Sequence, residues 1–214
     1  MTINQGGISW AAESMKMGVY SRWHELFRVK DAHWSRVVEY PWIMLSAGFR
    51  PADWVLDAGG GHSVLGPEVV KVGSYLVNLD LDLPEHYRQN PGIYYVRGDL
   101  RRMPYPDGCF NKVICVSVIE HILNPVAIVR ELWRVTAPGG RLLLTIDVAD
   151  NYRWNHTVDM NVAGEIAGMF GLALPQEPKD ILTQYFPEYE RKEGEAEVVL
   201  LKVLCLWCDK PRVE

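Results

Sequence analysis

The stretch that decides the fold is WVLDAGGGHS, residues 54–63, an apolar run that ends in an acid and three consecutive glycines. A short apolar run bounded by glycines is typical of a buried β-strand followed by a tight turn. Glycine is needed where the backbone takes positive φ angles or approaches a ligand closely, because it carries no Cβ atom. The stretch therefore predicts a strand and a turn that face a nucleotide-like ligand.

A dinucleotide-binding turn does not fit this stretch. The G-x-G-x-x-G fingerprint requires a glycine at position 64, where the chain has Val64. The turn alone therefore leaves the kind of nucleotide open.

Length and composition favour one globular domain. The chain has 214 residues, of which 48% are hydrophobic and 11% aromatic, enough for a sizeable core. No apolar run approaches the roughly 18 residues of a membrane span, and the first ten residues lack the features of a leader peptide, so we expect a cytoplasmic protein. The net charge is -5 and the basic residues are scattered, which disfavours nucleic acid as a partner.

Four cysteines are too few for a disulfide framework in a chain of this length. Cys205 and Cys208 have the spacing of half a zinc site or a redox pair. They lie in an apolar run, however, where a spacing of three places the two sulfurs on opposite faces of a strand. Buried structural thiols are the favoured interpretation.

After residue 51 the pattern alternates between strands and helices, which predicts βαβ units and a parallel sheet with right-handed crossovers. Before it, residues 8–47 have a helical pattern rich in aromatics. The expected strands are 54–57, 75–80, 93–97, 112–117, 141–148 and 198–208; the clearest helices are 64–72 and 125–135, residues 158–170 could form another, and 180–189 are ambiguous.

Chemically informative residues follow several of these strands. Ligands of an open parallel sheet bind beyond the carboxyl ends of its strands. The first strand ends in Asp57, and the next in Asp80, which is 80 − 61 = 19 positions past Gly61, close to the spacing at which an acid binds ribose hydroxyls. Gly98-Asp99-Leu100 follows the third strand and suits the amino edge and face of an adenine. The fourth runs into Ser117-Val118-Ile119-Glu120-His121.

With these motifs in this order, the chain resembles the class I S-adenosylmethionine-dependent methyltransferases, in particular the small kind grouped as type 11. The resemblance spans about residues 52 to 148. It departs from the usual family pattern at Ser63, where a third small residue, often glycine, is common, and at Asn111, where aspartate is usual. The matching segments are VLDAGGG (55–61), LD (79–80), GDL (98–100), MPYPDGCF (103–110), VIEHI (118–122) and APGGRL (137–142).

The resemblance implies an α/β fold, a three-layer Rossmann-like sandwich whose seven-stranded, mostly parallel sheet has an antiparallel last strand. Residues 1–214 then form a single domain: an N-terminal helical lid (1–50), a cofactor-binding core (51–148), and a substrate loop with C-terminal strands (149–214). The expected cofactor is S-adenosylmethionine, with S-adenosylhomocysteine as product and no metal. The resemblance places the cofactor on Asp57, Gly59, Gly60, Gly61, Asp80, Leu81, Asp99, Leu100 and Ser117, and Asp82 competes with Asp80 for the ribose.

An activated methyl donor needs only an aligned nucleophile and the exclusion of water, and a hydroxyl acceptor also benefits from a base with a near-neutral pKa. His121 and Asp147 are the catalytic candidates, with His156 as a further base. The acceptor is expected to contact residues of the lid and of the loop after the fifth strand: Trp34, Arg36, Tyr40, Tyr152, Trp154 and His156, with Glu39 and Trp42 as further lid residues.

Three functions stay open at this point. The favoured one is methylation of a small molecule, with an oxygen nucleophile such as a sugar or secondary-metabolite hydroxyl. The alternatives are a tRNA or protein methyltransferase, and a catalytically inactive subunit that binds the cofactor. No membrane partner is expected, and the oligomeric state is open, a homodimer being one option.

Overall fold

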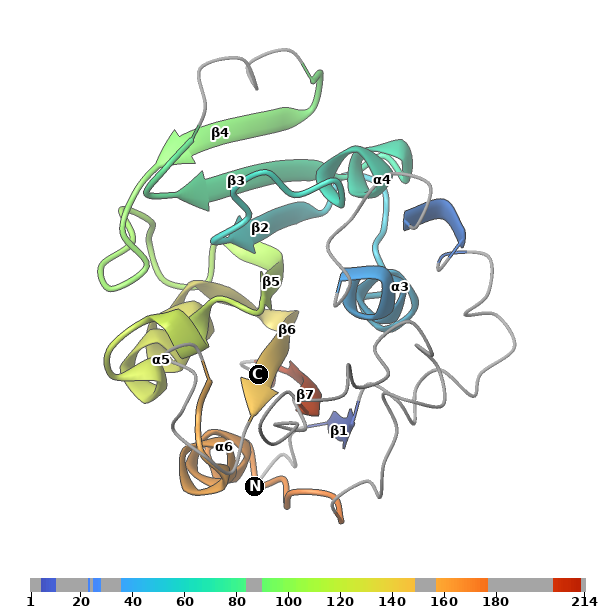
Figure 1. Cartoon of the computed structure of the whole chain (residues 1–214). Helices are drawn as coiled ribbons and strands as arrows, with labels where there is room; N and C mark the ends of the chain where they lie inside the picture. Colours follow the sequence, from blue (N-terminus) through green and yellow to red (C-terminus); the bar gives the residue numbers. More distant parts are fainter. Residues whose placement is uncertain are drawn as a thin grey trace.

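A computed structural model describes residues 5–10, 23, 25–27, 36–83, 90–148, 157–176 and 202–212. Seven strands form one sheet in the order β1-β7-β6-β5-β2-β3-β4 (Figure 1). The strands are β1 (Gly6–Trp10), β2 (Trp54–Ala58), β3 (Tyr75–Asp80), β4 (Ile93–Arg97), β5 (Phe110–Val116), β6 (Thr136–Val148) and β7 (Lys202–Asp209). The helices are α3 (Arg36–Ser46), α4 (Gly66–Lys71), α5 (Pro125–Val135) and α6 (Met160–Gly168), with a 3₁₀ turn, η2, at Ile119–His121.

Six of the seven strands run in one direction. Strands β4, β3, β2, β5 and β6 pair in parallel, and β7 pairs antiparallel with both β6 and β1. This confirms the predicted α/β sheet with its antiparallel last strand. It also follows that all the parallel strands end at the same edge.

The origin of one edge strand was not predicted. Residues 8–47 were expected to be helical, but Gly6–Trp10 pairs along β7, with Ile8 opposite Leu206. A Cβ atom at Gly7 would lie 2.5 Å from the Trp207 ring nitrogen, so the glycine permits this close pairing. The helix prediction was wrong here because the free hydrogen-bonding edge of β7 lies nearly 200 residues away in sequence, where no local pattern can reveal it.

Helices cover both faces of the sheet, which confirms the three-layer arrangement. Figure 1 shows α3 and α4 on one face and α5 and α6 on the other. Leu56 on β2 and Leu144 on β6 belong to the core under α5, and the neighbouring Val55 and Leu143 belong to the core under α3. Alternate residues of each strand therefore point to opposite helix layers.

Helix α5 begins and ends as predicted. Asn124 caps its first turn by accepting a hydrogen bond from the Ala127 amide, and Pro125 occupies the first helical position, where no amide donor is needed. The two C-terminal thiols also lie as predicted, with Cys205 in one core and Cys208 in the other.

Within the first 50 residues, β1 lies in the sheet, residues 23 and 25–27 are helical, and α3 packs on β6 and β7. A lid function for this region stays a prediction, as do the domain boundaries. The expected helix 158–170 is α6, and residues 180–189 lie outside the described residues. Among the described helices, none is both long and apolar enough to cross a membrane.

Candidate active site

The common edge of the parallel strands brings together polar residues that are far apart in sequence. Asp57 lies near the end of β2, Asp80 ends β3, Ser117 follows β5, and Asp147 lies near the end of β6. In an open parallel sheet this edge is where ligands bind.

The glycine turn after β2 has a backbone that other residues would not tolerate. Gly59 and Gly61 have φ angles of +76° and +44°, and the Gly59 amide donates a 2.7 Å hydrogen bond to the Leu79 carbonyl. A Cβ atom at Gly60 would lie 2.6 Å from Asp57 Cγ. The three glycines therefore form a narrow turn that packs against the ends of β2 and β3, and this turn, residues 59–61, is called the glycine cradle below.

Two buried acceptors beside this turn have no hydrogen-bond partner: Asp57 Oδ2 and Asn78 Oδ1. Burial raises the pKa of Asp57 to about 7, against the opposing effect of a hydrogen bond from Ser63. The Asn78 side-chain amide donates to the Gly61 carbonyl at 3.2 Å, which ties β3 to the turn. Unpartnered buried acceptors are costly, so this cradle fits a ligand that brings hydrogen-bond donors.

The expected ribose acid lies beside the same turn. Asp80 Oδ2 is 3.3 Å from the position of a Cβ atom on Gly61, and Asp80 Oδ1 accepts a 2.9 Å hydrogen bond from the Asp82 amide. The competing Asp82 side chain is 94% exposed. Leu81, between them, is 60% exposed, which leaves an apolar side chain open to a ligand.

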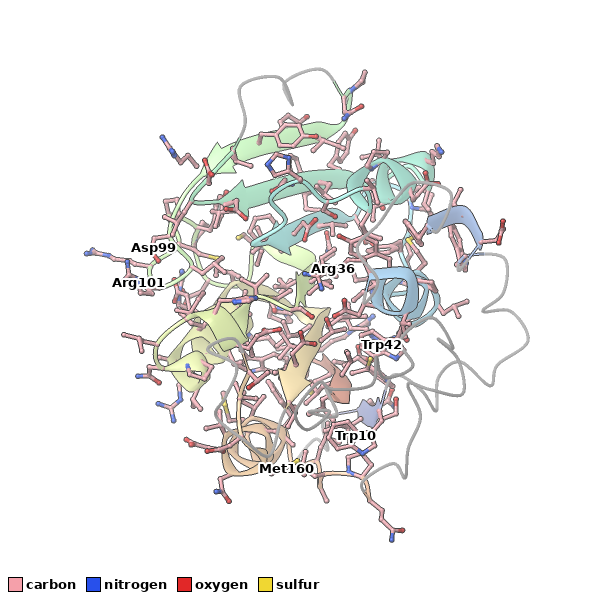
Figure 2. The ribbon with its side chains drawn as sticks, in the orientation of Figure 1. Trp10, Arg36, Trp42, Asp99, Arg101 and Met160 are labelled. Carbon is pink, nitrogen blue, oxygen red and sulfur yellow. The ribbon has the colours of Figure 1, made fainter. Side chains whose placement is uncertain are left out.

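Asp99, the expected adenine ligand, is held by another side chain. Arg101 Nε lies 3.0 Å and 2.9 Å from the two carboxylate oxygens, and this pairing lowers the pKa of Asp99. Figure 2 shows the pair at the outer edge of the molecule, well apart from Arg36. The Asp99 side chain is 35% exposed beside Arg101, and the neighbouring Leu100 is buried.

Helix α5 fixes the loop that carries these residues. Glu131 Oε1 accepts a 2.9 Å hydrogen bond from the Met103 amide. Arg134 pairs with Glu131 and donates to the Tyr105 carbonyl at 2.8 Å and the Met103 carbonyl at 3.3 Å. The backbone after β4 is therefore anchored from outside the predicted ligand site.

A second polar cluster lies where α3 crosses the ends of β5 and β6. Glu39 is completely buried and accepts hydrogen bonds from the hydroxyls of Ser117 and Thr145. Arg36 Nη1 donates to Glu39 at 2.6 Å, and its Nη2 lies 3.5 Å from the Ser117 carbonyl. Figure 2 shows Arg36 directed from α3 toward the strand ends.

Asp147 is the better placed of the two proposed catalytic groups. Burial, and then the nearby Glu39, raise the pKa of Asp147 to about 7, although Arg36 and Ser117 act in the opposite direction. Glu120 accepts a 3.2 Å hydrogen bond from the Asp147 amide, and its other oxygen is buried without a partner. Burial and Asp147 raise the pKa of Glu120 well above its usual range. His121 is exposed.

The remaining predicted residues are placed only in part. Tyr40 is buried, its ring meets Phe27 edge to face at 5.1 Å, and burial raises its pKa to about 12. Trp34, Tyr152, Trp154 and His156 lie outside the described residues. The substrate contacts of all these residues, and the cofactor contacts above, stay predictions.

Sequence reasoning missed the burial of Glu39 and the parts played by Glu120 and Thr145. The i, i+3 spacing of Arg36 and Glu39 was the one available signal of a paired cation and anion. Within the described part of the chain, no group of three or more His, Cys, Asp or Glu side chains could hold a metal ion.

The fold and the glycine cradle at its strand ends define a class I methyltransferase fold, as the sequence predicted. Residues 56–144 match the family model described as a methyltransferase domain.

The chain is 33% identical over 100 residues to a demethylmenaquinone methyltransferase from Beutenbergia cavernae, a match that covers 45% of this chain and 42% of that protein. It is 26% identical over 190 residues to a sterol 24-C-methyltransferase from Pneumocystis carinii, covering 81% and 46%. The chain thus spans less than half the length of these relatives.

Among solved structures, the fold is similar to 1,6-didemethyltoxoflavin-N1-methyltransferase from Burkholderia thailandensis, which was solved with 1,6-didemethyltoxoflavin and S-adenosylhomocysteine bound. The TM-score is 0.61 and the identity 14%, over 89% of this chain and 84% of that one. At this identity the similarity supports the fold alone.

Proposed function

We propose that this protein transfers a methyl group from S-adenosylmethionine to a small-molecule acceptor. The observation that carries the proposal is the glycine cradle with its two buried, unpartnered acceptors, Asp57 Oδ2 and Asn78 Oδ1. The family match over residues 56–144 supports the same conclusion. When bound, the cofactor supplies a methyl group already activated by a sulfonium.

The residues present suit the parts of this cofactor. Asp80, beside the glycine turn, would accept hydrogen bonds from the ribose hydroxyls, and Leu81 and Leu100 would offer apolar contacts to the adenine. Asp57 and Asn78 would accept from donors that approach the turn. The chain itself would bind and orient the reactants and exclude water, which are the main requirements for this transfer.

For the acceptor we propose an oxygen nucleophile, such as a sugar or secondary-metabolite hydroxyl, whose proton passes to Asp147. A group that removes a proton works best when its pKa lies near the working pH, and burial brings the pKa of Asp147 to about 7. The relatives' names give demethylmenaquinone and a sterol as acceptors, so these two belong in any screen. A cytoplasmic location stays a prediction.

Isothermal titration calorimetry with S-adenosylmethionine tests the cofactor assignment. We expect saturable binding that Asp80→Ala weakens at least tenfold and that Asp82→Ala, at a 94% exposed side chain, leaves nearly unchanged. Equal binding by both variants would refute the assignment of Asp80 to the ribose. An absence of binding by the wild type would refute the proposed function. A methyl-transfer screen across hydroxyl, quinone, sterol, amine, tRNA and peptide acceptors then tests the acceptor class.

A further inference from the structure

Glu39 is buried on α3, outside the residues expected to bind the cofactor. Its carboxylate is fully engaged: one oxygen accepts from Ser117 and Thr145, and the other accepts from Arg36 at 2.6 Å. A carboxylate held in this way keeps a fixed position at the ends of β5 and β6.

The Ser117 hydroxyl connects this carboxylate to Asp147. Ser117 Oγ donates to Glu39 Oε1 and lies 3.5 Å from Asp147 Oδ1. Ser117 also has a positive φ of 43°, unusual for a residue with a side chain. The backbone is thus held in a strained conformation that directs the hydroxyl between the two carboxyl groups.

We infer that Glu39 is a positioning residue which, through the Ser117 hydroxyl, orients Asp147 to take the acceptor's proton. This inference rests on the proposed function. As the acceptor oxygen forms its bond to the methyl carbon, the methyl–sulfur bond breaks with its electron pair left on sulfur, and the acceptor proton passes to Asp147.

Other charged or titratable groups also face Asp147 and must be kept constant in any test. From the described elements packed around it these are Arg36 on α3, Glu120 on η2 and the buried thiol of Cys205 on β7. Of these neighbours, Glu39 is the one whose charge opposes ionisation of Asp147 most strongly, and Arg36 favours it. Removing the Glu39 charge therefore should ease the ionisation of Asp147.

The test is a carbon-13 NMR titration of the carboxyl groups of the full chain, with the Asp147 resonance assigned by its loss in Asp147→Asn. We expect a midpoint at about pH 7 in the wild type. Glu39→Gln should lower this midpoint by about one pH unit, because a like charge is removed. Glu39→Asp, which keeps the charge, should stay near the wild type.

Glu68→Gln is the matched control, because Glu68 is also buried on a helix and paired with a cation three positions away, Lys71, but belongs to α4. Its midpoint should equal that of the wild type. An unchanged midpoint in Glu39→Gln would overturn the inference.

A second variant keeps the test decisive if Glu39→Gln does not fold. Ser117→Gly removes the hydroxyl, and glycine accepts the positive φ at this position without strain. Because the Ser117 hydrogen bond favours the ionised Asp147, this variant should raise the midpoint, and a lowered or unchanged midpoint would overturn the inference.

Once the acceptor screen supplies a substrate, the acid limb of kcat should move with the same midpoint in each variant, and KM for S-adenosylmethionine should stay within about twofold in Glu39→Gln. If the acid limb of kcat does not move with the midpoint of the Asp147 titration, the role of Glu39 is refuted. Failure of the calorimetric binding experiment would instead refute the proposed function and leave the carboxyl titration intact, so the two failures are distinguishable.

Discussion

The buried Asp57 makes a specific prediction about stability. Asp57→Asn replaces a carboxyl group by an amide of nearly the same size, so packing against the glycine turn is kept. The Asn oxygen can still accept the hydrogen bond that Ser63 donates to Asp57. The main change is the loss of a group that ionises inside the protein.

The size of the effect on the free energy of unfolding follows from the pKa of Asp57 in the unfolded and folded states. Burial raises the pKa of Asp57 from 3.8 to about 7, a difference of about 3 units. At about 1.4 kcal/mol per unit, this corresponds to about 4 kcal/mol. Because the folded protein holds the proton more tightly than the unfolded chain, the stabilisation is complete below pH 3.8 and disappears as the pH rises through about 7.

The assay is urea unfolding of the wild type and the variant between about pH 4 and pH 8. The free energy of unfolding of the wild type should fall with rising pH, relative to that of Asp57→Asn, by up to about 4 kcal/mol. Asp82→Asn, at an exposed side chain, should run parallel to the wild type across the range. If Asp57→Asn also runs parallel to the wild type, then Asp57 is not a buried, uncompensated acid and the fit of the cradle to a donor-bearing ligand loses its main support.

Two further predictions concern the turn and the loop that border the site. Gly60→Ala should lower the free energy of unfolding by about 1–3 kcal/mol, measured by urea unfolding, because its Cβ would lie 2.6 Å from Asp57 Cγ. Gly168→Ala, with nothing within 4 Å, should instead raise it by about 0.5–1 kcal/mol; equal effects would argue against a closed cradle. Arg134→Ala should cost about 2 kcal/mol, because it leaves backbone acceptors and a paired carboxylate unsatisfied. Hydrogen exchange at the Met103 amide should then accelerate, and unchanged protection there would contradict the anchoring of this loop.

Much of the sheet was predictable because its signals are local. Three apolar runs are strands as expected: Trp54–Ala58, Tyr75–Asp80 and Ile93–Arg97. Short apolar segments between turn residues usually form buried strands where strands and helices alternate along the chain. Helix α5 was predicted to the residue, because its apolar positions recur at helical spacing.

Other features escaped prediction because they depend on distant partners. The segment Gly6–Trp10 has no marked strand pattern of its own and becomes a strand by pairing with β7. The pairing of Asp99 with Arg101, two residues away, was also not predicted, and the role of Asp99 as an adenine ligand stays a prediction. A short-range ion pair of this kind is not visible from motif spacing, which reports the backbone position and not the direction of the side chain.

The sequence by itself determined the parallel sheet, the glycine turn at Gly59–Gly61 and the order of the acids along the strand ends. These features follow from hydrophobic periodicity and from the unique backbone freedom of glycine, and both act over a few residues. The tertiary structure decided which polar groups share the site. Glu39 meets Ser117 across 78 positions of sequence and Thr145 across 106, and only the packing of α3 over the ends of β5 and β6 brings them together. Burial at that crossing, which depends on the whole fold, is also what raises the pKa of Asp147 to about 7.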